Sequence, residues 1–210
     1  MRFIFIHPPR IVQLLFSNVI WTNVTKEILL TFDDGPNSET TEIILRVLNK
    51  YKIKALFFVN GKNGKENFSY LEEISSEGHF FGNHTENHLK NLNNLSIGKI
   101  REEILRTDEI ISHFQNKTNL FRPPYGRITF KLYRILKSLN LKVMMWTLLT
   151  EDYLGDLNIV KRNIDRYLME KSIIIFHNNP NAKNILHDSL EYLIEKLNER
   201  GLRIGDTFSF

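Results

Sequence analysis

The sequence predicts an α/β protein built on a mostly parallel β-sheet. Short apolar runs alternate with amphipathic helical patterns along nearly all of the 210 residues, and no Pro/Gly/Ser-rich linker interrupts them. Because a strand, a helix and the next strand form a right-handed crossover, this alternation makes neighbouring strands parallel. About seven strands are expected, a number compatible with an open doubly wound sheet or with a small, irregular barrel. Polar residues with chemical capacity follow several of these strands, which is where both folds carry their active sites.

The first expected strand covers residues 27–32, a mostly apolar run that reads as a buried strand. The helix after it, 38–50, carries an apolar face with the spacing of an amphipathic helix. The residues of this face are Ile43, Ile44, Val47 and Leu48. Further strands are expected at 54–59, 79–81, 119–122, 141–148, 172–176 and 202–204, and further helices at 68–77, 97–114, 128–140, 158–170 and 184–200.

Residues 1–25 are predicted to form an apolar arm that packs on a domain of residues 26–210. The opening apolar run is similar to the start of a signal peptide, but Pro8 and Pro9 interrupt it and no small-residue cleavage site follows. No stretch approaches the ~20 apolar residues of a bilayer-spanning helix, so no transmembrane segment is expected. An uncleaved export or membrane-surface segment is the alternative for this arm.

Composition excludes several classes of site. The chain contains no cysteine, which rules out disulfides, cysteine-ligated metal centres and thiol nucleophiles. Its net charge is +4, from 28 Lys and Arg against 24 Asp and Glu. The basic residues are interleaved with acidic ones along the expected helices, as on a solvated helix face, so no nucleic-acid partner is expected. The oligomeric state and the compartment stay open.

Residues able to perform acid–base or metal chemistry follow five of the expected strands. Asp33 and Asp34 end the first strand, and His84 and His88 come shortly after the third. The residues that follow later strands are Arg122, Tyr125, Asp152, Tyr153 and His177. Because the carboxyl ends of parallel strands meet at one edge of the sheet, we expect these side chains to form one site.

His84 and His88 are spaced to bind one metal ion. On a helical turn, residues i and i+4 lie about 5–6 Å apart on one face, so both imidazoles would reach the same ion. With one carboxylate they would leave coordination positions open, as in hydrolytic zinc sites and in non-haem iron oxygenases. Two solvated surface histidines are the alternative.

The adjacent pair Asp33 and Asp34 supplies such a carboxylate. At a strand end broken by Gly35 and Pro36, the two side chains diverge and can do separate work. One acid would bind the metal while the other stays free as a general base. An Asx turn that starts the next helix is the alternative, although it accounts for only one of the two acids.

Four short motifs give these residues a family resemblance. They are TFDDGP at 31–36, HTENH at 84–88, RPPYG at 122–126 and IFH at 175–177. With these motifs, in order across residues 27–205, the chain resembles the polysaccharide deacetylases of the NodB-homology group, carbohydrate esterase family 4. The resemblance implies a distorted (β/α)-barrel of about seven strands. It also implies a carbohydrate partner and removal of N-acetyl groups from an amino-sugar polymer or oligomer of the peptidoglycan or chitin type.

The resemblance further implies a role for each residue by its motif position. Asp34, His84 and His88 would bind a divalent ion, usually zinc, with cobalt or another divalent ion as alternatives. Asp33 would be the general base and His177 the general acid. The other implied roles are an oxyanion donor in the backbone N–H of Tyr125, orienting groups in Arg122 (for Asp33) and Asp152 (for His177), and substrate contacts from Pro124, Tyr125, Tyr153 and Ile175.

One motif departs from the family pattern. Where the family usually has an acid three residues after Trp146, this chain has Leu149, and the later Asp-Trp pair is Asp152-Tyr153. We expect this change to affect substrate preference more than activity. Two alternatives therefore stay open. The same fold could act on another acyl bond, in an O-acetyl polysaccharide or a cyclic amide or imide, or it could be a non-catalytic carbohydrate-binding relative.

Three further residues have weaker claims on the site. His79 lies in an apolar segment and is expected to be a buried, hydrogen-bonded core histidine. Trp146 fits the core and a sugar-stacking platform about equally well. Asn178, directly after His177, is a candidate for lining the groove. A polymer substrate would favour the bacterial cell envelope, whereas the N-terminus shows no clear cleavable signal.

Overall fold

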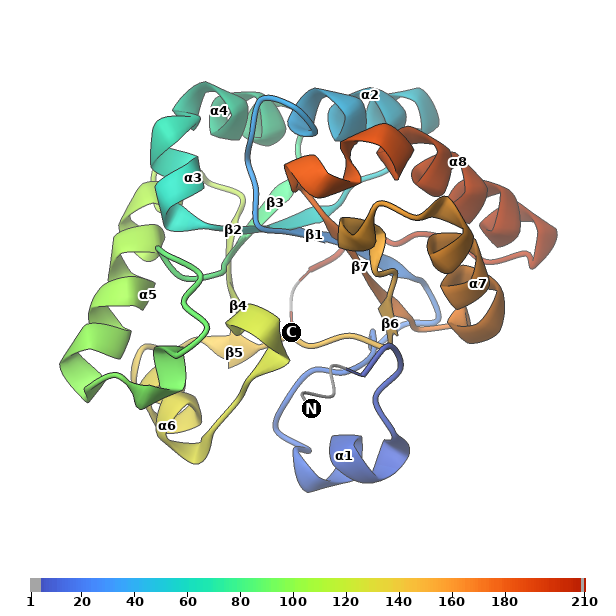
Figure 1. Cartoon of the computed structure of the whole chain (residues 1–210). Coiled ribbons are helices and arrows are strands. Elements are labelled where there is room, and N and C mark those ends of the chain that lie inside the picture. The colour runs from blue at the N-terminus through green and yellow to red at the C-terminus, as the bar shows by residue number, and fades with distance from the viewer. Residues whose placement is uncertain (1–4, 209) are drawn as a thin grey trace.

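Seven parallel strands form a curled, incompletely closed barrel in the computed structural model, which describes residues 5–208 and 210. In hydrogen-bonded order they run β5-β4-β3-β2-β1-β7-β6 (Figure 1). Their bounds are β1 (Leu29–Asp33), β2 (Leu56–Val59), β3 (Phe80–Asn83), β4 (Lys117–Phe121), β5 (Lys142–Val143), β6 (Leu148–Leu149) and β7 (Ile173–His177). The distorted α/β barrel expected from the sequence is confirmed.

Helices surround this sheet, and α2 to α8 form a ring on its outside (Figure 1). Within the described residues the helices are α1 (Arg10–Leu15), α2 (Thr41–Tyr51), α3 (Gly61–Glu66), α4 (Phe68–Ser76), α5 (Ile97–Ile111), α6 (Phe130–Ser138), α7 (Leu157–Tyr167) and α8 (Lys183–Glu199). In α2, Ile44, Val47 and Leu48 are buried in the core that also includes β1, β7 and α8. The apolar face predicted from the sequence therefore covers the sheet.

Successive residues of β1 point to opposite sides of the sheet, as strand geometry requires. Leu30 and Phe32 join the core between the sheet and its helices, whereas Leu29 joins a smaller core inside the barrel. Thr31 and Asp33 share the inner side with Leu29 and are buried there. The alternation thus directs the carboxylate of Asp33 into the barrel, where the candidate site lies.

One expected strand is wrong in its extent. Residues 141–148 do not form a single strand, because β5 pairs with β4 at one edge of the sheet and β6 with β7 at the other. The carbonyls of Met144 and Met145, between these two strands, accept hydrogen bonds from the side chain of Arg122. The expected strand at 202–204 is also wrong, since this segment makes a single bridge from Ile28 to Ile204.

Two six-residue helices, α1 and α3, were not expected. α3 contains Gly61 and Gly64 and has no apolar face, so its sequence carries no helical periodicity. Its start is capped by the side chain of Asn60, which accepts a hydrogen bond from the N–H of Asn63. Local capping and contacts with α4 and α5 therefore stabilise this helix.

The N-terminal arm lies against the gap between the two edges of the sheet (Figure 1). Residues 1–4 of the expected arm lie outside the described residues. The N–H of Met145 donates to the carbonyl of Ile20 at 2.8 Å, and the N–H of Leu149, in β6, donates to Ile6 at 2.9 Å. The arm therefore supplies backbone partners near both edges of the open barrel. The division between arm and domain at residue 25 stays a prediction.

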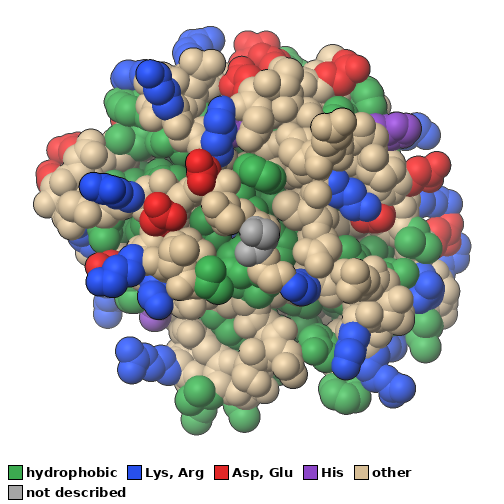
Figure 2. Space-filling model, turned by 180° about the vertical axis from the view of Figure 1, so that it is seen from behind, with side chains coloured by type: hydrophobic (Ala, Val, Ile, Leu, Met, Phe, Trp, Pro, Cys, Tyr) green, Lys and Arg blue, Asp and Glu red, His purple; other side chains and the backbone are tan. Residues whose placement is uncertain are grey.

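Charged side chains of both signs are interspersed on the surface. On the face opposite to that of Figure 1, Lys and Arg lie among Asp and Glu around a centre of apolar and neutral groups (Figure 2). This distribution agrees with the interleaving of charges along the sequence. None of the helices in the described part of the chain is both long enough and apolar enough to cross a membrane.

His79, just before β3, is the buried core histidine that the sequence predicts. It is 1% exposed, and its Nδ1 accepts a hydrogen bond from the N–H of Ala55 at 3.3 Å. Burial, followed by the nearby charge of Lys54, lowers the pKa of His79 to about 4. The unfolded chain binds this proton near pH 6.5. The native state therefore loses stability as the pH falls from about 6.5 to about 4.

We expect His79→Gln to reduce this acid sensitivity, because glutamine keeps an acceptor for Ala55 but does not titrate. The loss in unfolding free energy between pH 7 and pH 4 should shrink by up to about 3 kcal/mol. Urea unfolding at several pH values measures the slope. His187→Gln, at an exposed histidine, is the matched control. Equal slopes for His79→Gln and the wild type would contradict the assignment.

Candidate active site

The carboxyl ends of the strands surround a cavity of about 460 Å³. Its lining includes eight of the residues selected from the sequence, namely Asp33, Asp34, His84, His88, Tyr125, Tyr153, Ile175 and His177. Arg122 and Asp152 do not line the cavity but are buried behind its wall, in contact with Asp33 and His177. Pro124 is buried in the turn after β4 and does not line the cavity, where Pro123 lies instead. The expected substrate contact from Pro124 stays a prediction.

Asp34, His84 and His88 present three ligand atoms to one point. The Nε2 atoms of His84 and His88 lie 3.6 and 3.4 Å from Oδ1 of Asp34. All three ligand atoms lie within 4.8 Å of one another. These separations suit one ion held at about 2.0–2.2 Å by each atom. Two imidazoles and a carboxylate match the donor set of hydrolytic zinc sites, so the residues fit a divalent metal.

Hydrogen bonding and burial prepare both imidazoles for metal binding. Nδ1–H of His84 donates to the carbonyl of Arg122 at 2.7 Å, which leaves Nε2 unprotonated and facing Asp34. Burial lowers the pKa of His88 to about 4, with help from His84 and against the charge of Asp34. His88 is therefore neutral near pH 7, the form that binds metal.

The two histidines do not lie on a helical turn, contrary to the sequence-based expectation. Residues 84–88 form an irregular loop after β3, yet the rings of His84 and His88 have centroids 4.8 Å apart. Glu103 of α5 holds this loop through Asn87. Its carboxylate accepts hydrogen bonds from the backbone N–H of Asn87 at 2.9 Å and from the side-chain amide at 2.8 Å.

The carboxylate of Asp33 is paired with a fully buried arginine. Nη1 of Arg122 donates to Oδ1 of Asp33 at 2.7 Å and to the hydroxyl of Thr31 at 2.8 Å. Burial lowers the pKa of Arg122, whereas the charge and hydrogen bond of Asp33 act against this shift. Oδ2 of Asp33 lies 3.9 Å from Nε2 of His84, so this second oxygen stands beside the metal-ligand triad.

His177 is held by Asp152 from behind. Nδ1–H and the backbone N–H of His177 donate to the two oxygens of the Asp152 carboxylate, each at 2.7 Å. Burial acts to lower the pKa of His177, but the charge and hydrogen bond of Asp152 outweigh it and raise the pKa to about 9. His177 is therefore protonated at neutral pH, and Nε2–H is left for the cavity.

Asp34 is held by two asparagines that the sequence analysis did not select. The side-chain amide of Asn179 donates to Oδ2 of Asp34 at 3.2 Å, and that of Asn63 donates to its carbonyl at 2.8 Å. Burial acts to raise the pKa of Asp34, but the three surrounding histidines outweigh it and lower the pKa. Asn63 lies in α3, which has no sequence signal, so only the fold reveals this contact.

Asn178 does not line the groove, and that expectation is wrong. Its side chain is 1% exposed and forms hydrogen bonds with three polar residues at the start of α2. Gly35 approaches it so closely that a Cβ on Gly35 would lie 2.2 Å from its amide nitrogen. Asn178 thus joins the loop that carries Asp34 to the loop after β7, while its neighbour Asn179 faces the cavity.

Left-handed backbone angles occur in several loops of this site. Asp34, Thr85, His88 and Tyr125 have φ values of 76°, 66°, 49° and 58°. Each such residue costs on the order of 1–3 kcal/mol and persists only where its surroundings fix it. The Tyr125 ring, for example, packs on His88 with centroids 4.6 Å apart. Strain of this kind is typical of functional sites.

Comparison with known proteins assigns this chain to a family of hydrolases. The polysaccharide deacetylase family matches residues 22–144 of the sequence, more than half of the chain. The chain belongs to this family. The match ends before Asp152 and His177. The family comparison therefore does not cover these two residues, and only the structure shows where they lie.

Several proteins with similar sequences are named as peptidoglycan deacetylases. A peptidoglycan-N-acetylglucosamine deacetylase from Bacillus cereus is 32% identical over 180 residues, which is 84% of this chain and 65% of that protein. A peptidoglycan-N-acetylmuramic acid deacetylase from Bacillus subtilis is 34% identical over 183 residues, 85% of this chain and 37% of that protein. This chain therefore spans less than two thirds of the length of either relative.

Solved structures share the fold. A peptidoglycan N-acetylglucosamine deacetylase in complex with a naphthalenyl N-oxidanyl-benzamide matches with a TM-score of 0.84 at 29% identity, over 94% of both chains. A pseudoenzyme of carbohydrate esterase family 4 from Bacillus anthracis matches with a TM-score of 0.76 at 27% identity, over 87% of this chain and 64% of that chain. Because the same fold occurs in a pseudoenzyme, the fold alone does not make a chain active, and activity depends on the site residues.

We expect Glu103→Ala to weaken binding of a divalent ion by about 10–100-fold, the usual effect of removing a group that orients a ligand. The carboxylate of Glu103 anchors the loop that carries His88, and it touches no ligand itself. Competition with a chromogenic chelator measures the affinity, and circular dichroism checks the fold. Glu109→Ala, at an exposed position of the same helix, is the control. An unchanged affinity in Glu103→Ala would contradict the anchoring role.

Proposed function

We propose that this chain is a metal-dependent hydrolase that removes N-acetyl groups from the amino sugars of a peptidoglycan-type glycan, with residues 26–210 as the catalytic domain. The observation that carries the proposal is a base and an acid in the same cavity as a metal-ligand triad. Asp33 is a carboxylate beside the triad, and His177 is protonated at neutral pH. Amide hydrolysis needs both, because water loses a proton and the leaving nitrogen gains one.

Asp34, His84 and His88 would hold the metal, with zinc favoured by two imidazoles and one carboxylate and cobalt as a substitute. When bound, a divalent ion polarises the acetyl carbonyl and lowers the pKa of water towards ~7. The depressed pKa values of Asp34 and His88 support this assignment, since both groups are then in the forms that bind metal near pH 7.

Asp33 would accept the proton of the attacking water, and Arg122 orients this carboxylate through the hydrogen bond to Oδ1. His177 would donate its Nε2 proton to the amide nitrogen as the C–N bond breaks, which releases acetate and a free amine. Asp152 fixes the ring so that Nε2 faces the cavity. The backbone N–H of Tyr125 is the proposed donor to the carbonyl oxygen, where such a donor typically contributes ~10²–10³ in rate.

Aromatic and apolar side chains would contact the acetyl group and the sugar. Tyr153 packs edge-on against His177, with centroids 4.8 Å apart. Burial raises the pKa of Tyr153 to about 12, so its hydroxyl stays a neutral hydrogen-bond donor. Ile175, Leu149 and Trp146 complete an apolar part of the same lining, which suits a methyl group. Trp146 thereby contributes to both the core and the cavity.

Peptidoglycan is the proposed glycan because the relatives above carry it in their names, and the bacterial cell envelope is then the proposed place of action. Leu149 supports a second candidate, hydrolysis of another acyl bond on the same scaffold. It lines the cavity where the family usually has an acid. An O-acetyl ester or a cyclic amide would use the same base and metal ligands with a different leaving group.

Acetate release before and after chelation tests the proposal. We expect release from peptidoglycan fragments or N-acetylglucosamine oligomers, its loss on chelation, and its return when zinc or cobalt is restored. Release from O-acetyl xylan or ring opening of a hydantoin, without release from the N-acetyl sugars, would support the second candidate. No turnover of any of these substrates by the metal-loaded chain would favour a non-catalytic carbohydrate-binding protein.

Asp33→Asn should abolish acetate release while leaving metal binding intact, because it removes the base but none of the three proposed ligands. The metal content of the purified variant and its thermal unfolding are measured beside its activity. Lys62→Gln, an exposed change on α3, is the control. Substantial activity in a folded, metal-loaded Asp33→Asn variant would overturn the role of Asp33.

The pH profile tests His177 as the acid. The protonated ring is present below its pKa of about 9 and lost above it, so kcat/KM should fall on the alkaline side. In Asp152→Asn the charge that raises this pKa is gone, and burial then lowers it. The alkaline limb should therefore move to lower pH. A limb that stays in place in Asp152→Asn would contradict the assignment.

A further inference from the structure

A second cavity, of about 550 Å³, opens beside the active site. We call it the arm cavity, because the N-terminal arm forms one of its sides. It shares Lys90, Tyr125, Gly126 and Trp146 with the lining of the catalytic cavity, so the two cavities adjoin. Its volume lies within the range of about 300–1,000 Å³ that is usual for ligand sites.

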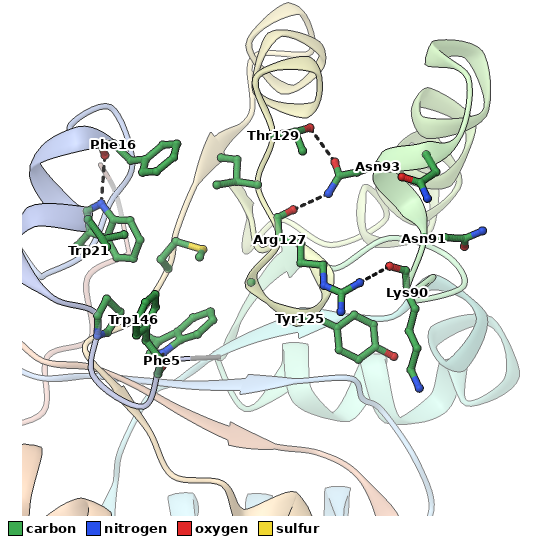
Figure 3. A pocket seen from close by; sticks show the side chains of 16 residues that line it. Phe5, Phe16, Trp21, Lys90, Asn91, Asn93, Tyr125, Arg127, Thr129 and Trp146 are labelled. Atoms are coloured by element: carbon green, nitrogen blue, oxygen red, sulfur yellow. Dashed lines mark hydrogen bonds between the residues drawn. The ribbon is translucent and has the colours of Figure 1, made fainter. Parts of the chain in front are cut away.

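One side of the arm cavity is aromatic and fixed in place. Figure 3 shows Phe5, Phe16 and Trp21 of the arm beside Trp146. The indole N–H of Trp21 donates to the carbonyl of Phe16 at 3.1 Å, and that of Trp146 donates to the carbonyl of Phe5 at 2.8 Å. Three of these four residues precede residue 22, where the family match begins. Most of this side therefore lies outside the residues that the family match covers.

The opposite side is polar and positively charged. The loop of residues 90–94 provides Lys90 and three asparagines, and Arg127 stands next to it (Figure 3). Arg127 donates to the carbonyl of Lys90 at 2.6 Å, a neutral acceptor that does not cancel its charge. Among the described residues that line this cavity, none is acidic.

Both cations lie close to the entrance of the catalytic cavity. The guanidinium carbon of Arg127 is 5.2 Å and Nζ of Lys90 is 6.0 Å from the centroid of the Tyr125 ring. The ring of His88, a member of the metal-ligand triad, also packs on the Tyr125 ring. A group bound by the two cations would therefore lie beside Tyr125, next to the metal-ligand triad.

We propose that the arm cavity binds the neighbouring sugar of the same glycan strand, and that this sugar carries a carboxylate. The aromatic side takes the apolar face of the pyranose ring, the asparagines take its hydroxyl and acetamido groups, and Arg127 with Lys90 binds the carboxylate. A carboxylate is the fitting partner because it balances two cations in a cavity whose described lining offers no acid.

This proposal rests on the proposed function, because N-deacetylation at the metal ligands is assumed when the reacting sugar is identified. In a peptidoglycan-type strand without stem peptides, neutral N-acetylglucosamine alternates with N-acetylmuramic acid, whose lactyl carboxylate is free. With the acid sugar in the arm cavity, the neutral sugar lies over the metal ligands. The chain would then deacetylate N-acetylglucosamine and prefer strands whose lactyl carboxylates are free to strands whose lactyl groups are amide-linked to peptide, and to chitin, whose sugars are all neutral.

Tryptophan fluorescence reports on this cavity directly. The chain has two tryptophans, Trp21 and Trp146, and both line the arm cavity. The probes are a tetrasaccharide of alternating N-acetylglucosamine and N-acetylmuramic acid and the same compound with its carboxyls amidated. Each is titrated into the full zinc-loaded Asp33→Asn chain and into the chelated wild-type chain, neither of which should turn it over. We expect the acid form to bind about tenfold more tightly than the amide.

Removal of the cations should erase this preference. Arg127→Gln and Lys90→Gln should each reduce the ratio of the two Kd values several-fold, whereas Arg46→Gln, the same charge change on the exposed side of α2, should keep it. Equal Kd values for the two probes, an unchanged ratio in both variants, or no fluorescence response would overturn the proposal. Failure of acetate release in the wild-type chain would overturn the proposed hydrolysis alone, because the titration does not depend on turnover.

Discussion

The buried ion pair between Arg122 and Asp33 is the interaction on which the rest of the site depends. The guanidinium lies inside the barrel and is fully buried. It connects β1, through Thr31 and Asp33, to the segment between β5 and β6, through two carbonyls. Removing one partner of such a pair typically costs about 3–5 kcal/mol, because the other charge is left buried without compensation. The same contact therefore joins the barrel wall and holds a carboxylate in place beside the proposed metal ligands.

The open barrel explains why the arm matters. A curled sheet with two short edge strands leaves backbone donors and acceptors without strand partners, and the arm provides them from Ile6 and Ile20. By filling this gap, the arm also builds the aromatic side of the cavity beside the active site. One segment thus serves stability and shapes the groove, so changes in it would alter both.

The chemistry of the site depends on opposite electrostatic environments within one cavity. Around His177, the buried carboxylate of Asp152 outweighs desolvation and favours the charged ring, whereas at His88 desolvation prevails and the ring stays neutral. Two histidines of the same chain thereby differ in charge, as the proposed roles of acid and metal ligand require. The loops that hold these groups adopt strained backbone angles at Asp34, His88 and Tyr125, which the surrounding hydrogen bonds maintain.

The sequence by itself determined the alternation of strands and helices, the residues that end β1, β3 and β7, and the family resemblance, because periodicity and short motifs are local properties. It could not determine that residues 141–148 divide between two sheet edges, since this depends on the side chain of a distant arginine. Nor could it reveal the support of Asp34 by Asn63 and Asn179 or the loop geometry of His84 and His88. These features, like the groove formed by the arm, arise from contacts between segments far apart in the chain, and only the tertiary structure decides such contacts.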